Sequence, residues 1–104
     1  MSPDVSVIIP AFQAKAFIGR AVKSVQAQYG IRSEIVIAAD DDIDYSAVLA
    51  AEGIDLSDVV QCRTTQAQSG PSAARNLAAS VANADLIACL DADDALEDGR
   101  LVPL

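Results

Sequence analysis

The sequence of 104 residues contains no histidine, only two cysteines, and seven Lys plus Arg against fifteen Asp plus Glu. Without histidine the chain supplies no Ser-His-Asp triad, no Cys-His pair and no histidine-ligated zinc site. A net charge of -8 argues against a nucleic-acid-binding surface or an anionic-membrane-binding surface, because both need a basic footprint. Any catalysis must therefore use carboxylates, the remaining polar side chains or a hard metal ion.

Neither the two cysteines nor the apolar runs indicate redox chemistry or a membrane-spanning segment. Cys62 and Cys89 fit no metal or redox spacing, and each lies in a short apolar run, so we expect two buried free thiols. No run approaches the roughly 20 apolar residues of a membrane span. The N-terminus has neither a positive region nor an apolar stretch of signal-peptide length. We expect a cytoplasmic protein, and membrane association of a longer natural chain stays open.

A hydrophobic content of 52% is ample for the core of one domain, or of a piece of a larger one. Short β-type apolar runs alternate with longer amphipathic ones. The pattern predicts strands over residues 5–9, 34–39, 59–63 and 86–90, and helices over residues 15–28, 45–52 and 71–82, with a further helix beginning near residue 97.

This β-α-β-α-β-α-β order, with strands of the buried type, predicts an α/β fold in which a parallel sheet carries helices on both faces. In such sheets, ligands bind outside the carboxyl ends of the strands. Seven of the fifteen acidic residues form two clusters at such ends, and without them the chain is nearly neutral: Asp40, Asp41, Asp42 and Asp44; Asp91, Asp93 and Asp94. The acidic clusters should therefore share one edge of the sheet.

The second cluster, Asp91, Asp93 and Asp94, directly follows an apolar strand. Converging carboxylates repel one another unless a cation lies among them, and Mg²⁺ or Mn²⁺ prefers such oxygen ligands. The Asp-x-Asp pattern therefore indicates a site for a metal and a diphosphate. The alternative is a solvated acidic turn that caps a helix near Glu97.

In the first cluster, Asp40 follows the strand directly and should point into the crevice, whereas we interpret Asp41, Asp42 and Asp44 as a solvated surface. Four carboxylates within five positions should not all face one small ligand.

A helix should begin at the same edge after Gly70, where Pro71 suits a first helical position. Its free N–H groups suit a phosphate, and Arg75 would add a planar donor fork. The alternative is an ordinary helix start with an exposed arginine.

Four segments, in order, resemble the motifs of the family 2 glycosyltransferases. Residues 5–13 (VSVIIPAFQ) are similar to an opening strand VSVIIPxYN, and residues 34–41 (EIVIAADD) to a second strand that ends in Asp-Asp-Gly-Ser. Residues 70–76 (GPSAARN) resemble a Gly-x-x-x-Ala-Arg-Asn segment, and residues 90–94 (LDADD) a Leu-Asp-x-Asp-Asp signature.

The resemblance implies a Rossmann-like GT-A fold and transfer of a sugar from a nucleotide-diphospho-sugar, most typically a UDP-sugar, to an acceptor hydroxyl with Mg²⁺ or Mn²⁺. Carried over by position, the resemblance implies that Asp40 accepts a hydrogen bond from the base and that Arg75 reaches the base or phosphates. The other implied roles are these: Pro10 and Ala11 line the base pocket, Gly70 lies near the donor, Asp91 supports the motif, Asp93 holds the ribose or metal region, and Asp93 or Asp94 ligates the metal.

The chain departs from the family pattern in two respects. Measured from Glu34 without a gap, Asp40 matches the second of two usual acids and Ala39 occupies the first. Asp42 and Ile43 replace residues that usually keep the turn tight and polar, and Phe12-Gln13 replaces the usual Tyr-Asn. Family members also have an acceptor half that, in inverting members, supplies a carboxylate base, which we expect beyond residue 104. Residues 1–104 should be the truncated nucleotide-sugar-binding part, with weak donor binding, no turnover alone and a tendency to self-associate through an unpaired edge.

Two other interpretations compete with a glycosyltransferase. The first is a non-catalytic nucleotide-sugar-binding or regulatory module of the same fold, which the missing base favours. The second is a nucleotidyltransferase, which should have a Gly-rich basic loop after the first strand; residues 11–16 contain one lysine and no glycine. The sugar, the acceptor and the oligomeric state do not follow from the sequence.

Overall fold

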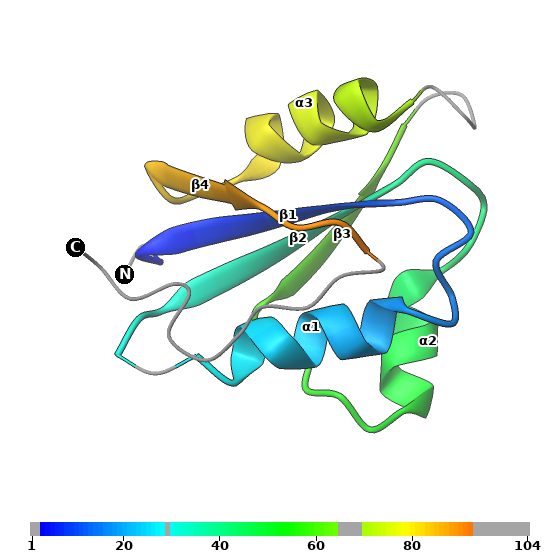
Figure 1. Cartoon of the computed structure of the whole chain (residues 1–104), viewed down its shortest axis with the longest axis horizontal. Helices are drawn as coiled ribbons and strands as arrows, with labels where there is room; N and C mark the ends of the chain where they lie inside the picture. The colour runs from blue at the N-terminus through cyan, green and yellow to red at the C-terminus, as the bar shows by residue number, and fades with distance from the viewer. Residues whose placement is uncertain (1–2, 29, 65–69, 93–104) are drawn as a thin grey trace.

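The computed structural model describes residues 3–28, 30–64 and 70–92 (Figure 1). Strands and helices alternate along them in the order predicted from the sequence: β1 (Val5–Ala11), α1 (Ile18–Gln26), β2 (Ser33–Ala39), α2 (Tyr45–Ala51), β3 (Val59–Arg63), α3 (Pro71–Val81) and β4 (Leu86–Cys89). The residues expected to form a helix from residue 97 lie outside the described part.

The strands form one parallel sheet in the order β3-β2-β1-β4. Figure 1 shows α3 on one face of this sheet and α1 and α2 on the other. The α/β prediction of a parallel sheet with helices on both faces is therefore confirmed. In the register of the central pair, Val5 lies opposite Ser33 and Ala11 opposite Ala39, so both strands end at the same edge.

Helix α1 is shorter than the predicted range of 15–28. It begins at Ile18 because residues 15–17 form a turn, in which the N–H groups of Phe17 and Ile18 both donate to the carbonyl of Ala14 at 2.9 Å. Its apolar stripe, which includes Val22 and Val25, is fully buried against the sheet, as the helical periodicity indicated.

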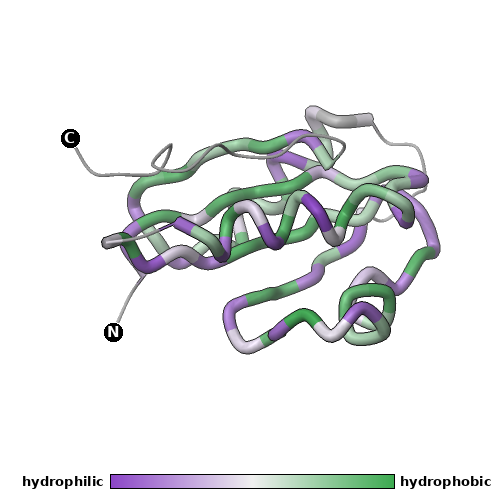
Figure 2. The backbone as a smooth tube through the Cα atoms, turned by 60° about the horizontal axis from the view of Figure 1, so that its bottom comes forward, coloured by the Kyte–Doolittle hydropathy of each residue, from purple (hydrophilic) through white to green (hydrophobic). Residues whose placement is uncertain are grey.

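The core has two layers because successive residues of β1 and β2 face opposite sides of the sheet. Val7 and Ile9 pack in the layer that contains α1, whereas Ile8 packs with Ala74 and Ala78 of α3. Each buried Val or Ile contributes about 1.5–3 kcal/mol. In Figure 2 the hydrophobic colour runs along the strands, and the turns between elements are hydrophilic.

The expectation that all four strands are buried is wrong for β3 and β4. These are the outer strands of the described sheet, and Val60, Leu86 and Ile87 are 40%, 60% and 41% exposed. Cys89 is exposed and Cys62 is half-buried, so the prediction of two buried thiols is also wrong, although both cysteines are free. Among the described residues each outer strand has one neighbour instead of two. Self-association stays a prediction.

None of the helices in the described ranges has the length and apolar character needed to cross a bilayer.

At the amino ends of the strands, a buried carboxylate joins β1, β2 and the segment before β4. Glu34 is 8% exposed and accepts hydrogen bonds from Ser6 Oγ (2.6 Å), Asn83 N–H (2.9 Å) and Asn83 Nδ2 (2.6 Å). Ser6 Oγ in turn accepts from Ala84 N–H at 3.1 Å. Burial raises the pKa of Glu34, but these hydrogen bonds outweigh it and hold the pKa below its ordinary value.

We expect this network to make the fold sensitive to acid. A carboxyl whose pKa is lowered by folding stabilises the native state above its unfolded pKa, and that stabilisation is lost as the pH falls through the native pKa. Glu34→Gln should cost about 1–3 kcal/mol at neutral pH, because all three partners of Glu34 are donors and the amide nitrogen accepts none of them. The variant should also flatten the loss of stability between about pH 6 and pH 3.

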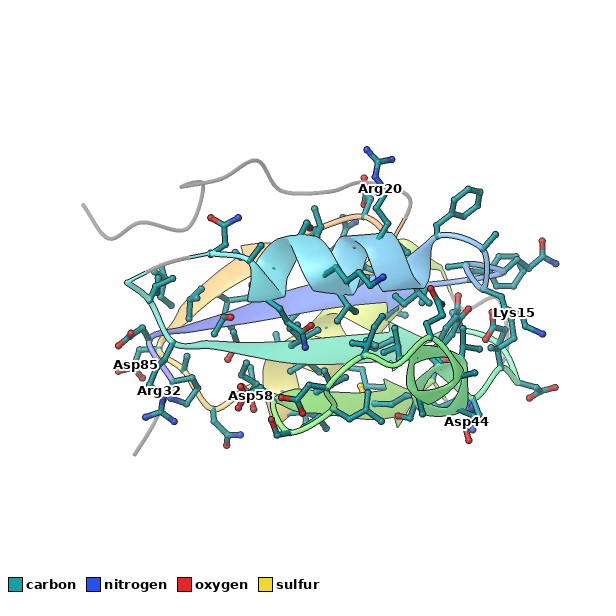
Figure 3. All side chains as sticks on the ribbon, turned by 90° about the horizontal axis from the view of Figure 1, so that it is seen from below. Lys15, Arg20, Arg32, Asp44, Asp58 and Asp85 are labelled. Carbon is teal, nitrogen blue, oxygen red and sulfur yellow. The ribbon has the colours of Figure 1, made fainter. Side chains whose placement is uncertain are left out.

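Urea unfolding followed across this pH range measures both effects. Asp85→Asn is the matched control, because Asp85 is an exposed carboxylate at the same end of the molecule (Figure 3). An unchanged acid profile in Glu34→Gln would contradict the role of the network.

Substitutions at two glycines, Gly19 and Gly53, test how α1 and α2 pack. A Cβ at Gly19 would lie 2.5 Å from Glu52 Oε1, but Glu52 is exposed and its carboxylate can move aside. Gly53 has open space around it but a φ of +76°, which disfavours any side chain. Gly19→Ala should therefore leave the free energy of unfolding unchanged or raise it by up to about 1 kcal/mol. Gly53→Ala should lower it by about 1–2 kcal/mol.

Chemical denaturation of the two variants, side by side, provides the comparison. A larger loss for Gly19→Ala than for Gly53→Ala would mean that the Glu52 carboxylate is held in place between the helices.

Candidate functional site

A cavity of about 550 Å³ opens at the carboxyl ends of the strands. It lies between the loop after β1, the end of β2, the start of α3 and the segment after β4. Its lining residues are Pro10, Ala11, Phe12, Gln13, Ala14, Phe17, Asp40, Gly70, Ala74, Asp91 and Ala92.

The cavity brings together most of the residues that the sequence singled out. The predicted residues that line it are Pro10, Ala11, Asp40, Gly70 and Asp91. Arg75 is half-buried on α3 and does not line the cavity, although Ala74 beside it does. Asp93 and Asp94 lie outside the described residues. The expectation that both acidic clusters share one edge is confirmed by Asp40 and Asp91.

Asp40 connects three segments at the end of β2. Its backbone N–H donates to the carbonyl of Ala11 at 2.8 Å, which extends the β1–β2 pairing by one bond. Its carboxylate is only 4% exposed and accepts from Thr64 Oγ1 at 2.7 Å and from Gly70 N–H at 2.8 Å. These two bonds orient the carboxylate at the cavity wall.

Helix α3 begins at the cavity wall. Gly70 is its N-cap and has a φ of 102°, a conformation that residues with a side chain rarely adopt. Pro71 follows at the first helical position, as the sequence indicated. Gly70 and Ala74 of this helix start line the cavity and have no large side chain there.

Asp91 is an exposed carboxylate on the opposite wall. The N–H of Leu90 donates to the Ile8 carbonyl at 3.0 Å, which carries the β4 pairing up to the cavity edge. Asp91 therefore leaves the sheet beside Pro10. No cluster of three potential metal-ligating side chains occurs in residues 3–28, 30–64 and 70–92. The carboxylate oxygen at this position is nevertheless the donor type that Mg²⁺ and Mn²⁺ prefer.

Sequence reasoning missed the aromatic rim of the cavity. Phe12 and Phe17 are 42% and 50% exposed, and both line the cavity. The available signal was a pair of large apolar side chains in the loop that follows a buried strand, where polar residues are usual. An exposed aromatic ring at the rim of a cavity suits a planar ligand.

The interpretation of Asp41 as a solvated acid is wrong. Its Oδ2 accepts from Gln13 N–H at 2.7 Å and from the Tyr45 hydroxyl at 2.8 Å, and its Oδ1 accepts from Ile43 N–H at 3.1 Å. Tyr45 is fully buried and its oxygen also accepts from Ala14 N–H at 3.2 Å. Burial and the Asp41 carboxylate raise the pKa of Tyr45 to about 12, so its hydroxyl stays a donor at neutral pH.

The rest of the acidic turn is held from β3 and α2. Arg63 donates through Nε to the carbonyl of Asp41 and through Nη2 to the carbonyl of Ile43, both at 2.8 Å. Asp42 is exposed, which confirms its assignment to the surface. Asp44 is exposed too but caps α2 by accepting from Ala47 N–H at 3.1 Å.

Figure 3 shows Lys15 and Asp44 at the end of the molecule that carries the cavity, and Arg32, Asp58 and Asp85 at the opposite end.

Comparison with known proteins agrees with this arrangement. The sequence model of the family "Glycosyl transferase family 2" matches residues 6–104. The succinoglycan biosynthesis protein ExoU of Rhizobium meliloti is 38% identical over 98 residues, which are 94% of this chain and 28% of ExoU. The UDP-Glc:alpha-D-GlcNAc-diphosphoundecaprenol beta-1,3-glucosyltransferase WfgD of Escherichia coli is 31% identical over 90 residues, 86% of this chain and 35% of WfgD.

Solved structures share the fold. Residues 1–349 of S. aureus TarS match with a TM-score of 0.75 and 22% identity over 91% of this chain and 28% of that one, and the same protein was also solved with UDP and with UDP-GlcNAc. The mannosyltransferase PcManGT from Pyrobaculum calidifontis, in complex with GDP-Man and Mn²⁺, matches with a TM-score of 0.74 and 22% identity over 91% of this chain and 29% of that one.

The chain spans 28% to 40% of the length of the curated relatives it matches, ExoU at the lower end and an uncharacterized glycosyltransferase of Haemophilus influenzae at the upper. The fold is that of GT-A glycosyltransferases, and the family model covers nearly the whole of this sequence. The chain belongs to glycosyl transferase family 2.

Proposed function

We propose that residues 1–104 form the donor-binding part of a glycosyltransferase that transfers a sugar from a UDP-sugar to an acceptor hydroxyl. The single observation that carries the proposal is the convergence of Pro10, Ala11, Asp40, Gly70 and Asp91 on one cavity at the carboxyl edge of the sheet. These residues come from four separate segments, and each belongs to one of the four family motifs. The similarity to WfgD, a glucosyltransferase whose name gives UDP-Glc as its donor, supports the same class of activity.

In this proposal the base lies against Pro10 and Ala11, with the Phe12 ring at the rim. Asp40 accepts a hydrogen bond from the imide N–H of uracil through an oxygen that Thr64 or Gly70 already orients. This pre-orientation favours binding because the carboxylate loses little freedom when the base arrives. The diphosphate lies toward the amino end of α3, where main-chain N–H groups and the helix dipole favour an anion. Arg75 lies on the same helix outside the cavity lining and, in this proposal, would reach the phosphates.

The metal proposal rests on the acidic signature at the end of β4. Asp93 and Asp94, with Asp91 beside them, would hold Mg²⁺ or Mn²⁺, since carboxylate oxygens are hard ligands. The bound ion would neutralise the negative charge that develops on the departing diphosphate. The complex of PcManGT with GDP-Man and Mn²⁺ supports this use of a divalent ion.

The acceptor site and the general base belong, in this proposal, to a longer natural protein. The relatives supply the support, because this chain covers 28% to 40% of their length. The described residues present Asp40 and Asp91 at the cavity, and both are assigned to the donor. Residues 1–104 alone should then bind the nucleotide but transfer no sugar.

Calorimetric titration with UDP tests the proposal in the full-length natural protein. We expect UDP to bind in the presence of Mn²⁺, and its affinity to fall about tenfold or more when Mn²⁺ is omitted, because the ion would link the diphosphate to the carboxylates. Asp94→Ala should reproduce that loss with Mn²⁺ present. Asp42→Ala, which removes an exposed acid of the other cluster, should bind UDP like the unchanged protein.

Two results would contradict the proposal. One is the absence of UDP binding at any Mn²⁺ concentration, and the other is equal affinity in the Asp94→Ala variant.

A parallel titration with GDP tests which nucleotide base the cavity prefers. Since guanine is larger and presents different hydrogen-bonding groups, we expect weaker binding than for UDP, and a preference for GDP would reassign the nucleotide while leaving the metal site in place.

A further inference from the structure

Asp41 and Tyr45 lie behind the cavity, and the proposed contacts with the donor do not explain why these two side chains are there. Asp41 and Tyr45 do not line the cavity, yet both are bound to the loop that does. We propose that Asp41 and Tyr45 are positioning residues, which hold the loop over residues 12–14 in the conformation that accepts the nucleotide. This inference rests on the proposed function of the cavity.

The geometry places one hydroxyl between two segments 31 residues apart. The Tyr45 hydroxyl donates to Asp41 Oδ2 at 2.8 Å and accepts from Ala14 N–H at 3.2 Å. The same Oδ2 accepts from Gln13 N–H at 2.7 Å. Two consecutive backbone N–H groups of the loop are therefore bound by one carboxylate and one phenol. We call this four-residue arrangement (Gln13, Ala14, Asp41 and Tyr45) the loop brace.

The loop needs such support because its backbone is strained. Gln13 has a φ of 51°, in the left-handed region that residues with a side chain rarely occupy. Such a conformation persists only when surrounding contacts hold it. The bond from Gln13 N–H to a carboxylate is charge-assisted and thus stronger than a bond to a neutral acceptor. Without it, the loop would relax toward an extended or right-handed conformation.

The strained residue lies within the cavity wall. Phe12, Gln13 and Ala14 all line the cavity, and Phe12 carries its exposed ring. A change of φ at Gln13 would therefore move the wall against which the base is proposed to lie. Asp41 directly follows Asp40 in the sequence. The same turn therefore presents the Asp40 carboxylate to the cavity and uses the Asp41 carboxylate to hold the loop over residues 12–14.

The brace is a property of this sequence rather than of the motif it resembles. The motif usually has Gly-Ser after its two acids, and here Asp41 and Asp42 occupy those positions. A glycine there offers no carboxylate for Gln13. Asp41 is fixed in turn by Ile43 N–H and by Arg63, which donates to its carbonyl. The carboxylate is thus oriented before any ligand binds.

Tyr45→Phe and Asp41→Asn weaken the brace with little change of shape. The phenylalanine ring fills the same buried space but leaves Ala14 N–H without its acceptor. Asparagine has one acceptor oxygen where Asp41 uses two, and it carries no charge. It therefore loses one set of these bonds, and a bond that it keeps to Gln13 N–H is no longer charge-assisted. Both variants should weaken the hold on the loop.

Two measurements on the full-length protein test the inference. Hydrogen exchange without ligand should show the Gln13 and Ala14 amides exchanging about tenfold faster or more in Tyr45→Phe, since a lost bond opens the loop locally. Titration with UDP and Mn²⁺ should show about five- to twentyfold weaker binding in Tyr45→Phe and in Asp41→Asn. The double variant should lose little more than either single one, because the two side chains act as a unit.

Two control variants separate positioning from general stability. Asp42→Asn removes the same charge from the adjacent, exposed residue and should change neither measurement. Ser6→Ala breaks the network at the other end of the sheet and should lower the unfolding temperature while leaving the affinity for UDP unchanged.

The outcomes distinguish this inference from the proposed function. Unchanged exchange at Gln13 and Ala14 in Tyr45→Phe would overturn the brace whatever the protein binds. Faster exchange with unchanged UDP affinity would leave a structural contact and overturn the positioning role. If the unchanged protein bound no UDP, the proposed function would fail first, and the positioning role would fail with it.

Discussion

The structure depends on the hydrogen-bonded junction at which β1 and β2 end together. The Asp40 N–H bonds to the Ala11 carbonyl, and the Asp40 carboxylate binds Thr64 beyond β3 and Gly70 at the start of α3. The main chain and the buried carboxylate of this single residue thereby fix the relative positions of three strand ends and one helix end. Because a buried carboxylate without donors would cost several kcal/mol, the surrounding segments must converge on it for the chain to fold.

The opposite end of the same strand is organised on the same principle. Glu34 is also buried, and it accepts from Ser6 and Asn83. At both ends the donors are hydroxyl, amide and main-chain N–H groups, which bind a carboxylate while occupying little space. Both carboxylates border a cavity. The cavity at Asp40 also contains Pro10, Gly70 and Asp91, whereas the donors around Glu34 tie together three segments of the sheet.

The sequence departs from the family motif where the structure adds support. Replacement of a usual glycine by Asp41 introduces a carboxylate behind the cavity wall, and the buried Tyr45 completes its hydrogen bonds. The loop after β1, with its exposed phenylalanines, is the part of the wall most directly affected.

Local sequence determined the order and type of the elements, and the placement of both acidic clusters at one edge. Periodicity depends on near neighbours, and parallel strands must all end on the same side, so these features needed no knowledge of packing. Asp40 and Gly70 are 30 residues apart, and the sequence predicted that they lie at the same edge because the parallel topology alone brings the end of β2 and the start of α3 together.

The tertiary structure alone decided which acids are solvated and which strands are covered. Asp41 is separated by 28 residues from Gln13, and its bond to that N–H depends on how two loops cross at the sheet edge. The exposure of β4 follows from its outer place in the sheet, which its apolar composition does not reveal. Contacts between distant segments set hydrogen-bond partners and burial, and no local pattern of residue types records them.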